Sequence, residues 1–203
     1  MQSRFEKRIL DSRPNRIMLV PPAPYRLHPM QLADIDAVLE IDRLGFPSPT
    51  KASMYRYELT ENQLAHYQVL TVATDAGEET IIGYAGYWVI ADETHVSSIS
   101  VTPAWRRRGL GELLLLNLLF MANEQATQLA TLEVREGNLA ARALYKKYQF
   151  EQVGLRKGYY RDTGENAVLM TVAPLDAAYY QTLERNRAAL FERLANQSAH
   201  PDG

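Results

Sequence analysis

The sequence of 203 residues contains no cysteine. This absence excludes disulfide bonds, thiolate metal sites and any cysteine-borne acyl intermediate, and it fits a reducing compartment. The four histidines are scattered along the chain, without the metal-binding pattern H-E-x-x-H. The nucleophile-elbow pattern G-x-S-x-G is also absent. The sequence therefore gives no support to a hydrolase or a metalloenzyme, and we expect no bound metal.

Long hydrophobic runs are missing as well. The longest apolar run is interrupted by Asn117, and it is far shorter than the roughly 20 residues that a membrane span needs. The first residues alternate charged and apolar side chains and show no signal-type hydrophobic block. A net charge of −2 gives no reason to expect a surface that wraps nucleic acid. We expect a cytoplasmic protein without membrane contact and without a direct nucleic-acid partner.

Prolines and amphipathic patterns divide the chain into three parts. Residues 1–23 end in closely spaced prolines and are predicted to form an N-terminal arm. Residues 24–175 have the length and mixed pattern of one domain with a substantial core. Residues 176–203 carry an amphipathic helix, predicted over 177–196, which we expect to be an extension outside that domain.

Strands and helices follow one another in a mixed order inside the central domain. Strands are predicted at residues 25–30, 67–74, 81–91, 94–102, 130–135, 150–155 and 167–172, with a polar turn over 159–166. Helices are predicted at residues 31–44, 52–63, 109–125 and 138–148. The order predicts an α/β or α+β fold, with a mixed central β-sheet and helices on both of its faces.

The most distinctive segment is V-T-P-A-W-R-R-R-G-L-G-E at residues 101–112. It joins a predicted strand to a predicted helix through Arg106, Arg107 and Arg108. Cations at a helix N-terminus oppose the helix dipole by about 0.3–1 kcal/mol each, so three of them together indicate a bound negative group. Free N–H groups, glycines that permit close approach and flanking arginines form a cradle for a pyrophosphate. The alternative is a basic surface loop that caps an ordinary helix.

Two common nucleotide-binding motifs do not fit this loop. The P-loop requires a lysine and a hydroxyl residue after its second glycine, whereas Gly111 is followed by Glu112. The dinucleotide fingerprint requires three glycines, and only Gly109 and Gly111 are present here. The loop therefore predicts a phosphate-bearing cofactor of another kind.

Glu133 is the candidate general base. Strand alternation places Leu132 and Val134 on one face of the strand and Glu133 on the other. A carboxylate near the C-terminal end of a central strand, beside a cofactor loop, can take a proton from a substrate. The alternative, which the residues alone favour, is an ion pair with a nearby arginine at a solvated sheet edge.

Tyr145 and Asn138 belong to the predicted helix that follows this strand. A tyrosine with a reference pKa near 10 can protonate a departing thiolate, and Tyr145 lies beside the core positions Leu144 and Tyr148 of its helix. The commoner fate of such a tyrosine is a core aromatic. The default role of Asn138 is that of a helix N-cap.

Three segments of the sequence resemble the GNAT superfamily of acetyltransferases: S-I-S-V-T-P-A-W-R-R-R-G-L-G-E-L-L-L, L-E-V-R-E-G-N-L-A-A-R-A-L-Y-K-K-Y-Q-F and R-K-G-Y-Y-R-D-T-G-E-N-A-V-L-M. Within it, they are similar to the bacterial ribosomal-protein-alanine N-acetyltransferases (RimI type). The resemblance extends over about residues 25–172. The arginine–glycine loop identifies only the superfamily, whereas the second segment with the later Y-Y and E-N-A is typical of protein N-terminal acetylators.

The resemblance implies the GNAT fold and a set of residues that bind acetyl-CoA. The strand backbone would hold the pantetheine arm, the loop would bind the pyrophosphate, and Asn138 would contact the same molecule. Glu133 would deprotonate the amine through water, and Tyr145 would protonate the leaving thiolate. The expected acetyl-CoA contacts are Ile99, Ser100, Val101, Arg106, Arg107, Arg108, Gly109, Leu110, Gly111, Glu112, Asn138 and Tyr145.

The acceptor side is expected at Phe46, Pro47, Tyr159 and Tyr160. The family commonly has F-P-W in the first of these loops, whereas this chain has F-P-S-P-T. With Ser48 in place of tryptophan, we expect a roomier groove and a relaxed preference for the first residues of the acceptor.

The expected function is transfer of acetyl from acetyl-CoA to a protein N-terminal amine. The N-terminal alanine of a small-subunit ribosomal protein is the expected acceptor. Alternatives are an enzyme for broader N-termini or for small-molecule amines, and a non-catalytic module that binds acyl-CoA or a ribosomal partner. A pure binder needs neither Glu133 nor Tyr145, which argues against the last alternative.

Overall fold

Residues 18–73 and 77–199 are described by the structure, a computed structural model. Their strands form one seven-stranded sheet in the order β1-β2-β3-β4-β5-β7-β6. Only β4 and β5 are parallel neighbours, so the expected mixed sheet is confirmed. The strands are β1 (Tyr25–Pro29), β2 (Ala65–Ala73), β3 (Glu79–Ile90), β4 (Glu93–Val101), β5 (Leu129–Arg135), β6 (Glu151–Tyr160) and β7 (Glu165–Val172).

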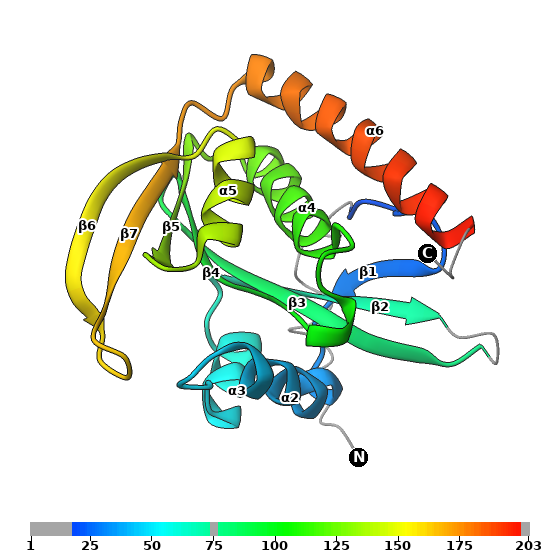
Figure 1. The fold of residues 1–203 in the computed structure, drawn as a ribbon, viewed down its shortest axis with the longest axis horizontal. Coiled ribbons are helices and arrows are strands. Elements are labelled where there is room, and N and C mark those ends of the chain that lie inside the picture. Colours follow the sequence, from blue (N-terminus) through cyan, green and yellow to red (C-terminus); the bar gives the residue numbers. More distant parts are fainter. Residues whose placement is uncertain (1–17, 74–76, 200–203) are drawn as a thin grey trace.

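Helices cover both faces of this sheet (Figure 1). On one face lie α2 and α3, and on the other lie α4, α5 and α6. Two short 3-10 turns, η1 and η2, precede α2 and the arginine loop. The bounds are η1 (Leu32–Asp34), α2 (Ile35–Gly45), α3 (Ala52–Thr60), η2 (Pro103–Trp105), α4 (Leu110–Glu124), α5 (Leu139–Lys147) and α6 (Ala177–Ala199).

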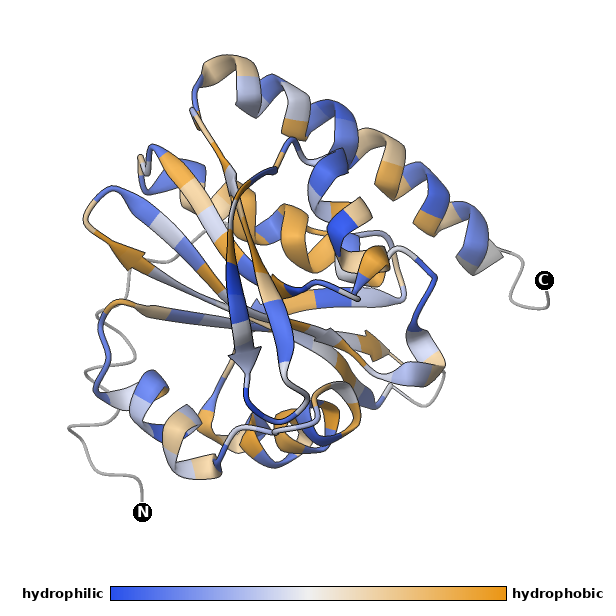
Figure 2. Ribbon diagram, turned by 60° about the vertical axis from the view of Figure 1, so that its left-hand side comes forward, coloured by the Kyte–Doolittle hydropathy of each residue, from blue (hydrophilic) through white to orange (hydrophobic). Residues whose placement is uncertain are grey.

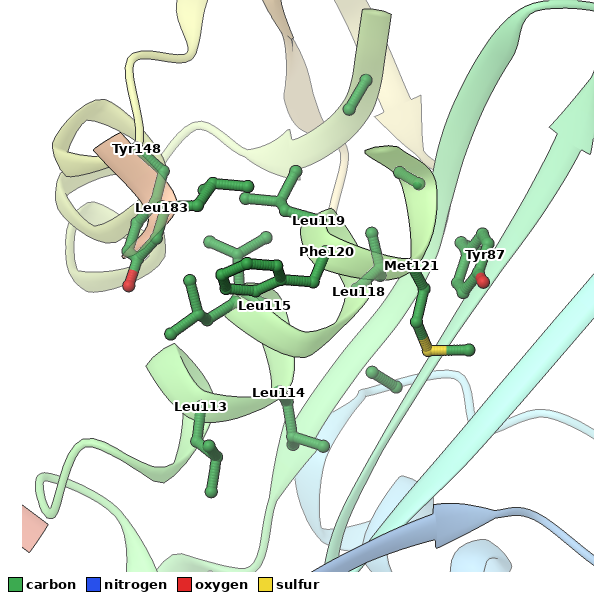
Figure 3. Packing of buried hydrophobic residues seen from close by; sticks show 14 of the residues in the cluster. Tyr87, Leu113, Leu114, Leu115, Leu118, Leu119, Phe120, Met121, Tyr148 and Leu183 are labelled. Carbon is green, nitrogen blue, oxygen red and sulfur yellow. The ribbon is translucent and has the colours of Figure 1, made fainter. Parts of the chain in front are cut away.

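Helix α4 forms the centre of the main core. It is buried on nearly all sides because it lies between the sheet and α6, and much of it has the hydrophobic colour in Figure 2. Figure 3 shows Leu115, Leu119 and Phe120 of α4 close to Leu183 of α6. The polar Asn117 is accommodated by hydrogen bonds to Gln68 and to the backbone N–H of Leu19. Burial of this many leucines is the main stabilising contribution of this layer.

The sheet divides at the boundary between β4 and β5. The two strands pair only from Glu93 with Leu129 to Val96 with Leu132, and β5 then continues along β7 as far as Arg135. Immediately after Val96, Ser97 is an extra residue in β4, since Gly86 pairs with Ser98 and Tyr87 with Val96. Such a bulge bends the strand and redirects it. The C-terminal half of β4 therefore has no partner on its β5 side.

Strand β6 is longer than the sequence predicts. It continues to Tyr160, and β7 begins at Glu165, so the predicted turn over 159–166 is wrong and the turn is shorter. As an edge strand, β6 is exposed along most of its length, so its residues lack the apolar alternation that marks a half-buried strand. The correction places Tyr159 and Tyr160 on an edge strand paired with β7, not in a loop.

The C-terminal extension packs directly on the domain. Leu183, Leu190 and Leu194 of α6 are fully buried in the same core as α4. Most of the predicted N-terminal arm, residues 1–17, lies outside the described residues. None of the helices within residues 18–73 and 77–199 has the length and hydropathy that crossing a bilayer requires.

Candidate active site

A cavity of about 240 Å³ opens where β4 and β5 separate. Glu133 reaches it from β5, Tyr145 from α5, and Asn138 from the turn between them. Ile99 of β4 and Phe46 and Pro47 after α2 also line it. The two predicted catalytic residues are therefore brought together, although they belong to different elements. A second cavity of about 560 Å³ shares Glu133 and Tyr160 with the first and continues past Tyr159.

Glu133 lies on the face of β5 opposite to the core. Leu132 and Val134 are buried, whereas the Glu133 side chain keeps 27% exposure, as strand alternation predicts. Its Oε1 lies 2.6 Å from Arg156 Nη1, and Tyr159 donates a hydrogen bond to the carboxylate. The hydrogen bond and charge of Glu133 raise the pKa of Tyr159. The alternative prediction, an ion pair between Glu133 and an arginine, is therefore confirmed. However, Glu133 lies on an interior strand of the sheet and lines both cavities.

The surroundings of Tyr145 keep its hydroxyl group protonated, as a proton donor requires. Its ring lies 5.8 Å from that of Phe150, and burial, aided by the nearby Tyr160, raises the pKa of Tyr145 to about 12. The hydroxyl is therefore fully protonated at neutral pH. The side chain is both a core aromatic, in contact with the main cluster, and a lining residue of the smaller cavity.

Asn138 has two roles in the geometry. Its side-chain Oδ1 accepts a hydrogen bond from the Ala141 N–H at 3.1 Å, which makes it the N-cap of α5. This confirms the default prediction. The same residue lines the smaller cavity, so a contact with a bound molecule there is compatible with capping.

The open side of β4 continues from the cavity to the arginine loop. Ile99, Ser100 and Val101 pair with β3 on one side only. The end of α2 lies close to this strand, since a Cβ added at Gly45 would be 2.5 Å from Ser100 Oγ. With any other residue at position 45, the Ser100 hydroxyl would have to rotate away. An unpaired strand side next to a cavity can bind an extended chain of amides through backbone hydrogen bonds.

The arginine loop ends at the N-terminus of α4. Gly109 is the N-cap with a φ of 82°, a left-handed conformation that favours glycine, and Arg107 also has a positive φ of 67°. The first N–H groups of the helix, which include those of Leu110 and Gly111, have no intrahelical acceptor. These donors and the helix dipole form an anion site. Leu110 itself is buried, so it can contribute only its backbone.

The three arginine side chains differ in direction, although all are exposed. Arg106 Nε donates to the Val101 carbonyl at 2.9 Å, which fixes the start of the loop. Arg108 stacks over Trp105, with its guanidinium carbon 4.8 Å from the ring centroid. Two of the predicted phosphate ligands therefore also hold the loop in shape.

The side chain of Glu112 is turned away from the loop. It accepts hydrogen bonds from Lys147 and Tyr148 and pairs with Arg193 of α6. Any contact of Glu112 with a bound phosphate would therefore be through its backbone N–H.

The expected acceptor side contains residues that the sequence motifs did not single out. Ser48 Oγ donates to Asp162, which also accepts from Arg135 at 2.7 Å. The Arg135 guanidinium lies 3.9 Å from the ring centroid of Tyr160, whose pKa is raised by burial to about 12. Arg135 shares the strand face of Glu133, and this alternation was the one available signal for it.

The loop after α2 is anchored by a buried carboxylate. Asp42 is 2% exposed and accepts hydrogen bonds from the Tyr84 hydroxyl and the Thr50 N–H. Burial raises the pKa of Tyr84 strongly, so it remains a donor. This anchor fixes the wall formed by Phe46 and Pro47. Within the described ranges, no group of three or more His, Asp or Glu side chains is arranged for a metal ion.

Comparisons with known proteins agree with this geometry. The acetyltransferase (GNAT) family matches residues 35–150. A Bacillus subtilis protein with the provisional name of a [ribosomal protein bS18]-alanine N-acetyltransferase is 37% identical over 143 residues, covering 70% of this chain and 91% of that protein. The [ribosomal protein bS18]-alanine N-acetyltransferase of Salmonella typhimurium is 33% identical over 145 residues, covering 70% and 93%.

A solved structure shows the same fold. The ribosomal-protein-S18-alanine N-acetyltransferase of Escherichia coli has a TM-score of 0.66 at 24% identity, and the match covers 75% of this chain and 96% of that one. The match of the family over residues 35–150 includes the arginine loop, Glu133 and Tyr145. The chain therefore belongs to the acetyltransferase (GNAT) family and is an N-acetyltransferase that depends on acetyl-CoA.

Proposed function

We propose that this enzyme acetylates the α-amine of a protein N-terminus, and that its acceptor is the N-terminal alanine of a small-subunit ribosomal protein. The observation that carries the mechanism is the meeting of Glu133 and Tyr145 in one cavity at the separation of β4 and β5. The names of the Bacillus and Salmonella relatives support the choice of acceptor.

The residues at this site fit acetyl-CoA. The N-terminal N–H groups of α4, with Arg106, Arg107 and Arg108 beside them, would bind the pyrophosphate. The unpaired side of β4 at Ile99 and Val101 would bind the amides of the pantetheine arm. When bound, acetyl-CoA supplies a thioester as the acyl donor. Asn138, on the cavity wall, is placed to contact the same arm.

Glu133 would act on the incoming amine. An N-terminal ammonium has a reference pKa of about 7.7–8, so removing its proton near neutral pH costs little and a carboxylate is a sufficient base. Glu133 accepts this proton through water, and the amine nitrogen then forms a bond to the thioester carbon. The ion pair with Arg156 orients the carboxylate, which lines both cavities.

Tyr145 would act on the departing thiolate. As the carbon–sulfur bond breaks, the hydroxyl proton of Tyr145 goes to the sulfur, and the nitrogen releases its second proton to solvent as it becomes an amide. The tyrosine is reprotonated from solvent. Direct attack of the amine on the thioester needs no enzyme-bound acyl group, which agrees with the lack of cysteine. One base and one acid that line the same cavity therefore suffice.

The acceptor would lie between the loop after α2 and the end of β6. Phe46 and Pro47 border the smaller cavity, and Tyr159 and Tyr160 border the larger. Tyrosines provide rigid contact area and can hydrogen-bond the backbone of an extended peptide. With serine at position 48, this groove is expected to accept several small first residues.

Competition between acceptors tests this proposal. We would measure kcat/KM with purified enzyme for peptides that begin with Ala, Ser, Gly or Met, and for polyamines and aminoglycosides. The proposal predicts that the alanine peptide is preferred and that free small amines react far more slowly. A small amine that outperforms every peptide would contradict it and leave a small-molecule acetyltransferase.

A further inference from the structure

Helix α6 contacts the N-terminus of α4 beside the arginine loop. A Cβ added at Gly109 would lie 3.1 Å from Leu190 Cδ1 and 3.8 Å from Leu194 Cδ2. Both leucines are fully buried. The residues that match the family end at position 150, so α6 is an addition to the matched region. A helix from outside the family match therefore supports the N-cap of α4.

Arg193 extends from this part of α6 to Glu112. Its Nη2 lies 2.8 Å from Glu112 Oε2. On the other carboxylate oxygen, Lys147 Nζ lies at 2.5 Å and the Tyr148 hydroxyl at 3.0 Å. The Glu112 side chain is only 11% exposed. Three helices, α4, α5 and α6, thus meet at one carboxylate, and two cations flank it.

Because Glu112 lies at the start of α4, the direction of its side chain decides whether the N–H groups there stay open. It is the third residue of α4 after the N-cap Gly109. A glutamate at this position can turn back toward the N–H groups at the start of its own helix, and the helix dipole attracts a carboxylate there. These N–H groups are the proposed donors to the pyrophosphate. A carboxylate that turned toward these N–H groups would compete with the pyrophosphate, because it would occupy the same donors and repel the negatively charged phosphates.

We propose that Arg193 is a positioning residue for acetyl-CoA binding. It holds the Glu112 carboxylate against α5 and α6 and so keeps the N–H groups of α4 open to the pyrophosphate. The inference rests on the proposed role of the arginine loop in binding acetyl-CoA. Lys147 and Tyr148 bind the other oxygen, so loss of Arg193 leaves Oε2 without its ion pair and removes one cation from the cluster.

Direct binding of CoA to the intact protein tests this role without a turnover assay. Calorimetric titration would compare wild type, R193Q, E112Q and the double variant E112Q/R193Q. We expect R193Q to weaken CoA binding about two- to fivefold, the usual range for a charge near a helix end, and at most about thirtyfold. R193K should retain most of the affinity. The double variant should bind CoA as E112Q does, because no carboxylate remains to compete.

A matched control lies on the same helix. Arg185 donates to Thr182 one turn away on α6, so R185Q removes an arginine without touching Glu112 and should leave CoA affinity unchanged. Wild-type affinity in R193Q, or a double variant weaker than E112Q, would overturn the proposal. If R193Q does not fold, K147Q, which removes the cation paired with the other carboxylate oxygen of Glu112, provides the same cycle with E112Q. A wild-type protein that binds no CoA would instead refute the role of the arginine loop.

Discussion

Ser48 Oγ lies 3.0 Å from Asp162 Oδ2, although the two residues are 114 positions apart. The bond joins the loop after α2 to the turn between β6 and β7, on the side of the cavity proposed for the acceptor. Hydrogen bonds from Arg135, and next from Ser48, hold the pKa of Asp162 below its usual range. Where the family resemblance implies a tryptophan, this chain has a small polar connection between two segments of the proposed acceptor groove.

Removal of this connection should affect the acceptor more than acetyl-CoA. S48A loses one hydrogen bond to a carboxylate, and we expect KM for an alanine-starting peptide to rise roughly two- to tenfold. The KM for acetyl-CoA and the melting temperature should change little, because Ser48 is exposed and distant in sequence from the arginine loop. Steady-state kinetics with each substrate varied in turn would show this. A rise in KM for acetyl-CoA alone would contradict the placement of the acceptor.

Replacing the carboxylate at position 133 should reduce turnover. E133Q keeps the shape of the side chain but cannot accept a proton, so kcat should fall by about 10²–10⁴ at pH 7, the range for a general acid–base group. The lost ion pair with Arg156 is partly exposed and contributes little to stability. E151Q, on the exposed part of β6 outside both cavities, is the matched control. Equal rates for E133Q and E151Q would remove Glu133 from the mechanism.

The pH dependence should reflect the raised pKa of Tyr145. An acid catalyst is active in its protonated form, so its contribution is lost only as the pH rises through its pKa, which is about 12. We therefore expect kcat to show no decline from Tyr145 between pH 7 and 10. Y145F should lower kcat throughout this range and leave CoA affinity nearly intact. A decline centred near pH 10 in wild type but not in Y145F would show an unperturbed tyrosine.

The arginine loop should make thermal stability depend on acetyl-CoA. A ligand at 100 times its Kd stabilises the folded state by about 2.7 kcal/mol, so the melting temperature of wild type should rise. Reversal of charge at Arg106 and Arg108, both to Glu, should weaken this rise, and more so at low salt. Differential scanning fluorimetry at two ionic strengths would measure it. The same rise in both proteins would mean that the loop does not bind the phosphates.

Local patterns predicted much of the site, because its main residues belong to regular elements. The alternation in β5 gave the direction of Glu133, and the glycine spacing located the N-terminus of α4. Contacts between distant segments could not be predicted: Arg193 and Glu112 are 81 positions apart, and no local pattern joins them. The length of β6 escaped prediction because an exposed edge strand has little apolar alternation.

Mass spectrometry of ribosomal-protein N-termini tests the central claim most directly. Cells with the gene intact, with the gene deleted, and with E133Q in its place would be compared. The account predicts an alanine-starting small-subunit protein that is acetylated only in the first case. Deletion and E133Q should each leave that N-terminus free, about 42 Da lighter by the chemistry of an acetyl group. Unchanged N-terminal acetylation of every ribosomal protein in all three cases would contradict the account.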